Sequence, residues 1–467
     1  MKRALFPIVS ALLIGGSGCA PSLSETRSAV EASVAHRLGI APTTFVAPDS
    51  GENDCWLRSV VRDKLEIDTA VAISLLYSPS LQALYGELGI SRADLIEAGL
   101  PKNPVFSMER RFRGQALEID VAQDFLSVFL IPLRKRVAES ALEATKFRVA
   151  NELLSHAFAV KTAFYSLQSA LQMQELRSSV REASDASVEI AERMGRAGNI
   201  SGLELAEQRS AGVAAKLALA DSEQEVSDAR ERLIVLLGLP ADLRDVQVSA
   251  RLSDPPSETP DVRKLEEQAV ERRLDLLAAR AELQSVLQSV GVTYTESELN
   301  DLVVTSHYER EPEGRSTAGP SIEVPIPIFD WGGGARAKAE AMVVQAESKL
   351  KAKSLEIRSE VRSAFTKMDI AKRRAVYYRK EVLPLRQAVL DETQLRYNGM
   401  ISGVFQLLTA RESQIQAGQS YVEALRDYWL ARTDLEAAVG AVLSASVEQR
   451  DVSAPDSSQA SSGGESR

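Results

Sequence analysis

This 467-residue sequence is poor in the residues that catalysis and metal binding use most often. It contains two cysteines, Cys19 and Cys55, and only three histidines, which lie far apart along the chain. No set of histidine, cysteine and acidic residues has the spacing of a known metal site, and neither a phosphate-binding loop nor a nucleophile elbow occurs. We therefore expect no enzymatic activity, no bound metal and no cofactor.

Positive charge and aromatic residues are also scarce. The chain has 55 Lys and Arg against 65 Asp and Glu, which gives a formal net charge of −10. Nucleic-acid binding needs clustered basic residues, so we expect no nucleic-acid partner. Hydrophobic residues make up 45% but aromatic residues only 5%. That composition favours helices with thin, extended packing over a thick core.

The first residues have the pattern of a bacterial export signal. A basic start, Lys2-Arg3, precedes an apolar run over residues 4–14 that is too short to span a membrane. Small residues then lead to Cys19, which resembles a lipoprotein cleavage box, although Gly16 stands where Leu is usual. We expect a signal peptide over 1–18 and lipid attachment at Cys19. An ordinary signal peptide with an incidental cysteine is the alternative, and Cys55 is expected to be a silent thiol.

One five-residue pattern occurs twice, 201 residues apart, each time between two long helical stretches. Gly, Ile, Ser and Gly recur in the same order at residues 198–202 and 399–403. Glycine within helix-forming sequence indicates a turn, because only glycine reaches positive φ without steric cost. We therefore expect each pattern to be the tip of a helical hairpin.

Each half of the chain has one long stretch with a helical apolar period. These stretches run from about 133 to 193 and from about 335 to 397, and return helices are expected over 203–237 and 404–443. Apolar residues in the two long stretches repeat at spacings typical of a coiled-coil seam. The seam residues are Leu142, Val149, Leu153, Val160, Leu167 and Leu171 in the first half, and Val343, Ala346, Leu350, Ile357, Val361, Ala364, Met368, Ala371 and Ala375 in the second.

Strand-like pairs precede both long helices. In the first half they lie at about 104–125, and in the second at about 302–329. The clearest alternation is Ile322, Val324, Ile326 and Ile328, which would share one face of a strand over 322–329. Apolar residues on one face and polar residues on the other suit either a membrane-barrel strand or a half-buried soluble hairpin. A Pro/Gly/Ser-rich loop is expected over 311–319.

Composition changes along the chain indicate six segments. After the signal peptide, we expect an irregular N-terminal arm over 19–62 and a first repeat over 63–250. A linker over 251–262 follows, then a second repeat over 263–445 and a disordered tail over 446–467.

Three groups of residues together resemble the outer membrane efflux protein family, the TolC-type channel-tunnels. They are Ser78-Pro79-Ser80-Leu81-Gln82-Ala83 with 98–104, Gly319-Pro320 through Gly332, and Arg396-Tyr397-Asn398-Gly399 with 405–411. The resemblance extends over about residues 63–445. It implies a mostly α fold with long helical hairpins and four membrane β-strands per chain. It also implies that three chains pool their strands into a 12-stranded β-barrel.

The resemblance also implies a function and partners. The expected protein is an outer-membrane exit duct, a lipid-anchored homotrimer with its helical body in the periplasm, which works with a periplasmic adaptor protein and an inner-membrane efflux pump. The tips would dock the adaptor through Gly198, Ile200, Ser201, Gly202, Gly399, Ile401, Ser402 and Gly403. Phe405, Glu204 and Glu207 are candidates for a constriction, against the alternative that Phe405 only packs between helices. Another family feature, carboxylates just after the second turn, is missing here.

Two matters stay open from the sequence. The first is whether the chain is instead a periplasmic coiled-coil scaffold lipoprotein without a pore. The second is the substrate, since drugs, copper or other metal ions, and exported proteins are all compatible with a passive duct.

Overall fold

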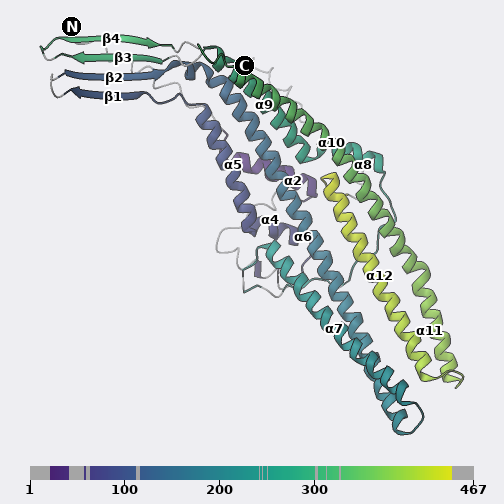
Figure 1. Ribbon diagram of the computed structural model, residues 1–467. Coiled ribbons are helices and arrows are strands. Elements are labelled where there is room, and N and C mark those ends of the chain that lie inside the picture. The colour runs from purple at the N-terminus through teal and green to yellow at the C-terminus, as the bar shows by residue number, and fades with distance from the viewer. Residues whose placement is uncertain are drawn as a thin grey trace, which may run out of the picture.

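The protein is elongated, with a small β-sheet at one end and two helical hairpins that reach to the other (Figure 1). The computed structural model describes residues 21–40, 57–58, 61, 64–111, 116–240, 242–243, 246–249, 251–299, 303–311, 313–324 and 328–443. The expected signal peptide, Cys19, Cys55 and the tail from 446 lie outside the described residues. The mostly α fold with a small β part is confirmed.

The two halves share one order of elements, with two differences. The first comprises α2 (Leu23–Leu38), α4 (Ile67–Tyr77), α5 (Pro79–Ala98), β1 (Val105–Arg111), β2 (Ala116–Asp124), α6 (Phe125–Arg196) and α7 (Gly202–Leu237). The second comprises α8 (Val262–Arg272), α9 (Leu274–Leu299), β3 (Val303–Arg310), β4 (Ser316–Glu323), α10 (Gly333–Tyr377), the π-helical η2 (Tyr378–Val382), α11 (Leu383–Asn398) and α12 (Val404–Val439). Only the first half begins with an additional helix, α2, and the single helix α6 corresponds to α10, η2 and α11 in the second.

Helix α6 is the central rod of the molecule. Its 72 residues give a length of roughly 110 Å at the usual rise per residue. It starts directly after β2, where the Asp124 side chain accepts a hydrogen bond from the Ser127 N–H. Of the predicted seam residues, Leu142, Val149, Leu153, Val160 and Leu167 are buried, and Leu171 is half-buried against the same core. The coiled-coil interpretation of this stretch is therefore correct.

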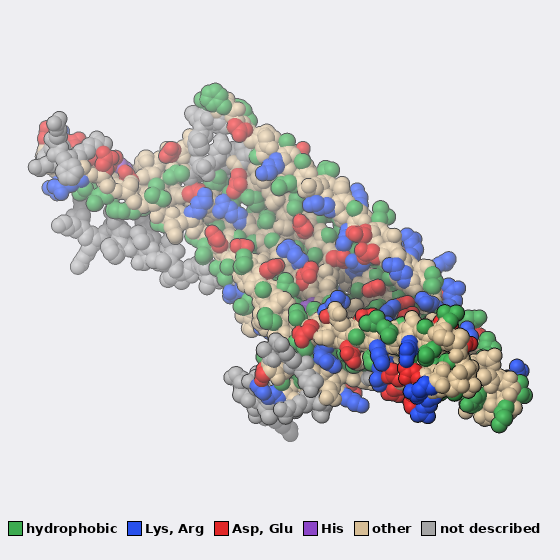
Figure 2. Space-filling view, turned by 60° about the horizontal axis from the view of Figure 1, so that its bottom comes forward, with side chains coloured by type: hydrophobic (Ala, Val, Ile, Leu, Met, Phe, Trp, Pro, Cys, Tyr) green, Lys and Arg blue, Asp and Glu red, His purple; other side chains and the backbone are tan. Residues whose placement is uncertain are grey.

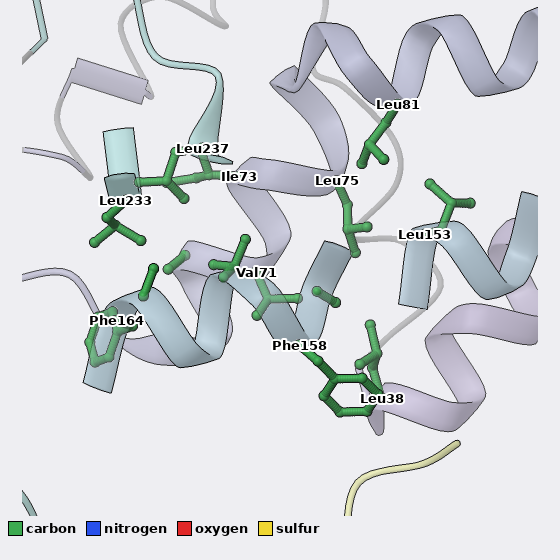
Figure 3. Packing of buried hydrophobic residues seen from close by; sticks show 14 of the residues in the cluster. Leu38, Val71, Ile73, Leu75, Leu81, Leu153, Phe158, Phe164, Leu233 and Leu237 are labelled. Atoms are coloured by element: carbon green, nitrogen blue, oxygen red, sulfur yellow. The ribbon is translucent and has the colours of Figure 1, made fainter. Parts of the chain in front are cut away.

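A large core forms where five helices of the first half meet. Figure 3 shows Leu38 of α2, Val71, Ile73 and Leu75 of α4, Leu81 of α5, Leu153, Phe158 and Phe164 of α6, and Leu233 and Leu237 of α7. Burying each such side chain contributes about 1.5–3 kcal/mol to folding. A second core in the other half joins α8, α9, α10 and α12 around Leu265, Leu276, Ile357, Val361, Met368, Tyr428 and Leu435.

The two return helices end in equivalent surroundings. Helix α7 ends at Gly238 (φ 69°), whose Cα lies against the backbone of Tyr77 and Ser78 between α4 and α5. Helix α12 ends at Gly440 (φ 78°), which lies against Arg273 between α8 and α9. Ser78 and Arg273 are 195 residues apart, close to the 201 residues that separate the two five-residue patterns. The structure therefore repeats the tertiary contact as well as the pattern.

One expectation for the N-terminal arm was wrong. Residues 23–38 form helix α2 rather than irregular chain, and Thr26, Val30, Val34, Ala35 and Leu38 are buried on it. Ser22 and Glu25 form a capping box, in which each side chain accepts a hydrogen bond from the other residue's N–H. This capping box and the spacing of four between apolar residues were the sequence signals that were missed.

The chain between the halves is irregular, as predicted, but it is fixed to the second half. The Trp429 indole N–H donates to the Ser253 carbonyl oxygen at 2.8 Å. The Lys372 ammonium donates to the carbonyl oxygens of Ser257 and Glu258 and to the Thr259 hydroxyl. These bonds hold the linker along α10 and α12.

The four strands form one antiparallel sheet in the order β1-β2-β3-β4. Strand β4 lies at 316–323, so the prediction of a strand at 322–329 and a loop at 311–319 was wrong. The reason is register: β3 ends at Arg310, which pairs with Ser316, so a short turn over 311–315 brings the chain back at once. Pro320 is tolerated in β4 because β4 is an edge strand of the single chain's sheet. Of the alternating isoleucines and valines, Ile322 lies in the strand and Val324 and Ile328 do not, while Ile326 lies outside the described residues.

Within the part of the chain that the structure describes, no helix is both long and apolar enough to cross a membrane.

Candidate functional site

Both predicted hairpin tips lie at the end of the molecule farthest from the sheet (Figure 1). The first joins α6 to α7, and the second joins α11 to α12. On the face shown in Figure 2, acidic and basic side chains alternate over the helical body. The two turns are the candidate contact surface at that end.

The first tip is a tightly capped turn. Gly198 has φ 75°, in the left-handed region that favours glycine. The Ser201 hydroxyl accepts a hydrogen bond from the Glu204 N–H at 3.2 Å, and the Glu204 carboxylate accepts one from the Ser201 N–H at 2.7 Å. These hydrogen bonds to Ser201 hold the pKa of Glu204 below its ordinary value. Glu204 therefore caps helix α7, a role that the sequence analysis did not assign to it.

The second tip has the same residues in a different conformation. Here the left-handed residue is Met400, with φ 57°, while Gly399 has φ −79°. Gly403 is the N-cap of α12 and supplies no side-chain hydrogen bond. The repeated pattern is thus displaced by one residue relative to the turn, and the expectation that Gly399 supplies a positive φ was wrong.

The tips expose apolar side chains in an asymmetric way. Met400 is 95% exposed, Ile401 80% and Leu203 70%. Ile200, the equivalent of Ile401, is half-buried. Large exposed apolar side chains that gather at one end of an elongated molecule are a candidate contact surface. The sequence analysis did not name Met400 and Leu203 as tip residues. The signal for them was an apolar residue within or next to a turn, where no hydrophobic core can bury it.

The three residues considered for a constriction do not come together in one groove. Phe405 is half-buried and lines a cavity of about 470 Å³ between α12 and the first hairpin, together with Ala183, Ser187, Ala211 and Leu408. Glu204 and Glu207 are exposed and do not line this cavity. The geometry supports the packing alternative for Phe405.

At the opposite end, the sheet has two chemically different faces. Because side chains alternate along a strand, the pairing register sorts them. We call the polar face the one that carries Ser107, Glu109, Glu118, Asp120, Thr305, His307, Glu309, Thr317 and Ser321. We call the apolar face the one that carries Phe106, Met108, Ile119, Val121, Val304, Tyr308, Ala318, Pro320 and Ile322.

The apolar face is uncovered in the single chain. Phe106, Met108, Val121, Tyr308 and Ile322 are all exposed. Two charged residues of this face, Arg110 and Arg310, lie at the end of the sheet where the turns are. Arg110 pairs with Leu117 beside the β1–β2 turn, and Arg310 pairs with Ser316 beside the β3–β4 turn. The two arginines of this face therefore lie at the rim of the sheet.

Residues 265–441 match the family described as outer membrane efflux protein. No curated protein matches the chain in sequence. The solved structures that share its fold include the Campylobacter jejuni CmeC outer membrane channel (TM-score 0.69, 14% identity, 85% of this chain and 91% of that chain). They also include the outer membrane protein VceC from Vibrio cholerae (0.64, 17%, 80% and 96%). A third is the open state of the Neisseria gonorrhoeae MtrE outer membrane channel (0.62, 16%, 80% and 88%).

The class of the protein follows from the fold and the family match together. The family match lies in the second half of the chain, and the family resemblance drawn from the sequence is confirmed there. Proteins of this family are channels rather than enzymes. The first half, which the family match does not include, repeats the architecture of the second.

Proposed function

We propose that three copies of this chain form a passive exit duct in the outer membrane. The duct would receive substrate from an inner-membrane efflux pump through a periplasmic adaptor protein. The single observation that carries the proposal is the sheet, with one apolar and one polar face, at the end of a long helical body.

The sheet supports assembly into a barrel. In the order β1-β2-β3-β4, the outer sides of β1 and β4 have no neighbouring strand among the described residues. Open edges in lipid leave backbone N–H and C=O groups without partners, at several kcal/mol each. Pairing β1 of one chain with β4 of the next would close twelve strands. The apolar face would then contact lipid and the polar face would line the lumen.

The helical body also has a surface suited to contact with neighbouring copies of the chain. A groove of about 870 Å³ runs along the outside of the first hairpin, lined by small residues of α6, Ala159 and Ala163, and by Ala229 and Val235 of α7. Small side chains allow another helix to approach closely. The groove is suited to helices of a neighbouring copy, which would complete a tunnel wall.

The tips support the adaptor contact. Met400, Ile401 and Leu203 form the exposed apolar part of the turns, and the sequence-predicted docking glycines lie between them. A Cβ atom added at Gly202 or Gly403 meets no atom within 4 Å. Their small size is therefore not needed for folding of the single chain, which supports a role for these positions in partner contact.

Lipid attachment at Cys19 belongs to the same proposal. The Pro21 carbonyl oxygen accepts a hydrogen bond from Arg92 Nε at 2.6 Å. Arg92 lies in the part of α5 nearest to β1, since α5 ends at Ala98 and β1 begins at Val105. An acyl chain two residues before Pro21 would thus start on the membrane side of the helical body. Ala substitution at Cys19 should abolish incorporation of labelled palmitate.

Two adjacent residues on β2 test the barrel. Val121 lies on the apolar face and Ala122 on the polar face. A charged residue on the lipid face of a barrel costs about 2–4 kcal/mol near the bilayer centre, whereas lumen positions tolerate charge. We expect V121R to be lost from the outer membrane and A122R to assemble as trimers. The measurement is trimer yield in purified outer membranes, followed by an efflux assay in a deletion strain.

A tip variant completes this experiment. G403V should assemble as the parent does, because the site is open, but should lose efflux because the turn no longer fits its partner. Trimers that fail to form would show that the turn is structural and that the docking role is wrong.

The alternative is a periplasmic scaffold lipoprotein without a pore. It predicts that V121R and A122R behave alike and that residues 105–124 and 303–323 are cut by protease in intact outer membranes. Protection of both segments together with selective loss of V121R would exclude it.

A further inference from the structure

A histidine and two carboxylates meet on the polar face of the sheet. His307 of β3 pairs directly with Asp120 of β2, and Glu118 lies two residues along the same strand. Nδ1 of His307 is 2.6 Å from Oδ1 of Asp120 and 3.7 Å from Oε1 of Glu118. One ligand atom from each of the three residues lies within 4.8 Å of the others.

These separations suit a common metal ion. Zinc lies about 2.0–2.2 Å from imidazole nitrogen and carboxylate oxygen. Ligand atoms at that radius are about 3.0–3.4 Å apart around a tetrahedral or octahedral ion. The two distances from His307 Nδ1 lie on either side of this range. Small side-chain rotations would therefore bring all three atoms onto one ion without moving the backbone.

Two further groups stand where outer-shell partners are needed. A metal-bound histidine usually donates its other ring N–H to a carboxylate, which fixes the tautomer and strengthens the ligand. Nε2 of His307 is 3.9 Å from Oε2 of Glu309, which lies two residues along the same strand. The Ser107 hydroxyl of β1 lies 3.5 Å from Oδ2 of Asp120, the oxygen that faces away from His307. The surroundings thus have the arrangement of a ligand shell with outer support.

The ligand types define the class of ion. Imidazole suits Zn²⁺, Cu²⁺ and Ni²⁺, and carboxylates add negative charge that compensates a dication. Three protein ligands leave coordination positions for water, and the three side chains are about one third exposed, 34% for His307 and 27% for each carboxylate. We propose that Glu118, Asp120 and His307 form an exchangeable site for a transition-metal dication of the Zn²⁺ or Cu²⁺ class.

This site lay beyond the sequence analysis, which expected no metal. Asp120 and His307 are 187 residues apart and belong to different halves of the chain. Only the pairing of β2 with β3 brings them together, and no local spacing records that pairing.

The test uses the full chain purified in detergent and freed of metal. Titration calorimetry with ZnCl₂ should show one saturable site per chain. Electron paramagnetic resonance with one equivalent of Cu²⁺ should show coupling to a single nitrogen. H307A and D120N should lose both signals. E309Q should weaken Zn²⁺ binding about 10-fold, as loss of an outer-shell partner does.

The matched control is E109Q. Glu109 lies on the same face opposite Glu118, and the substitution changes the charge by the same amount as D120N, but its carboxylate is not among the three ligand atoms. It should bind Zn²⁺ about as tightly as the parent. Equal weakening by D120N and E109Q, or unchanged binding in H307A, would overturn the proposal by showing nonspecific attraction to an acidic face.

All three ligands come from one chain, so metal binding at this site does not require that the chains form an efflux duct. If the proposed duct also forms, its lumen holds three such sites. Metal binding without efflux activity would reject the duct and keep the site, and efflux without metal binding would do the reverse.

Discussion

The two hairpins share one plan but differ in how firmly they are held. The first is built on a helix without interruption from Phe125 to Arg196, and its Pro132 lies near the start. The second changes from α10 to the π-helical η2 and then to α11, with Pro384 at the second residue of α11. A proline inside a helix removes one backbone hydrogen bond, and a π turn is one way to accommodate it.

Ion pairs across each hairpin follow the same trend. Within the described residues of the first hairpin, α6 and α7 are joined by Glu192–Arg209 at 2.8 Å and Asp185–Lys216 at 3.2 Å. In the second, Arg374 of α10 pairs with Asp427 of α12 at 3.5 Å, and α11 is joined to α12 by a hydrogen bond between the Gln387 and Gln414 side chains. Exposed pairs contribute little each, but the difference has the same direction as the helix break. Duplicated sequence has thus given one rigid and one softer hairpin.

The sharpest test compares the ends of the return helices, Gly238 and Gly440. Both have positive φ, which costs alanine about 1–2 kcal/mol. At Gly238 an added Cβ would lie 2.7 Å from the Tyr77 oxygen and the Ser78 Cα, which are backbone atoms that cannot move aside. At Gly440 the nearest atom is Cγ of Arg273, at 3.2 Å, on a flexible side chain.

We expect G238A to destabilise by about 3–4 kcal/mol, since overpacking adds to the φ cost. G440A should cost about 1–2 kcal/mol. Thermal unfolding of the purified protein, followed by circular dichroism, measures both. Equal losses would contradict the proposed difference between the two contacts.

The tips give the next test, because their left-handed residues differ. M400G should stabilise the second hairpin by about 1 kcal/mol, because it relieves the positive φ of a residue with a Cβ. G198A should destabilise the first by about the same amount. G399A is the control and should have little effect, since Gly399 has negative φ and its added Cβ meets only ordinary contacts. A larger loss of stability for G399A than for G198A would contradict the one-residue displacement of the second turn.

The smallest expected effect concerns helix capping. S201A removes the N-cap side chain of α7 and should cost about 1 kcal/mol. S402A, the equivalent change, removes no capping bond and should cost less, since α12 is capped by Gly403 without a side chain. Hydrogen–deuterium exchange of the first turns of α7 and α12 measures both changes. Faster exchange in S402A than in S201A would contradict this assignment.

The same cap has a pH dependence with a defined sign. The pKa of Glu204 is lowered in the folded chain from its ordinary value of 4.5. Such a carboxylate contributes stability above its unfolded pKa and loses that contribution as the pH falls through the lowered, folded value. Protection of the first turn of α7 should therefore fall in acid below about pH 4.5. E204Q should remove this dependence.

The sequence was sufficient for features that local patterns record. The tips at 198–202 and 399–403, the long helices between them and the strand-rich segments were all predicted. Each depends on glycine placement, apolar period or alternation within one stretch. The seam of Val149, Leu153 and Val160 is such a case, because residues three or four apart must share a helix face.

The features that were missed depend on partners distant in the chain or on one residue of register. Strand β4 was misplaced because its prediction followed the alternation that ends at Ile328. The true position is set by pairing with β3, which that alternation does not record. The displaced second turn has the same residues as the first, so only the backbone of Met400 distinguishes them. The cluster around His307 needs β2 beside β3, and that neighbourhood is a property of the tertiary structure.

The linker between the halves has an evolutionary consequence. Its anchors, Trp429 and Lys372, bond mainly to carbonyl oxygens of Ser253, Ser257 and Glu258, which every residue type would supply. Substitutions can therefore accumulate at these three positions while the path of the chain stays the same. Asp254 of the same linker differs, because its carboxylate binds the Tyr421 hydroxyl and the Arg379 guanidinium, so this one side chain is fixed while its neighbours are free to change.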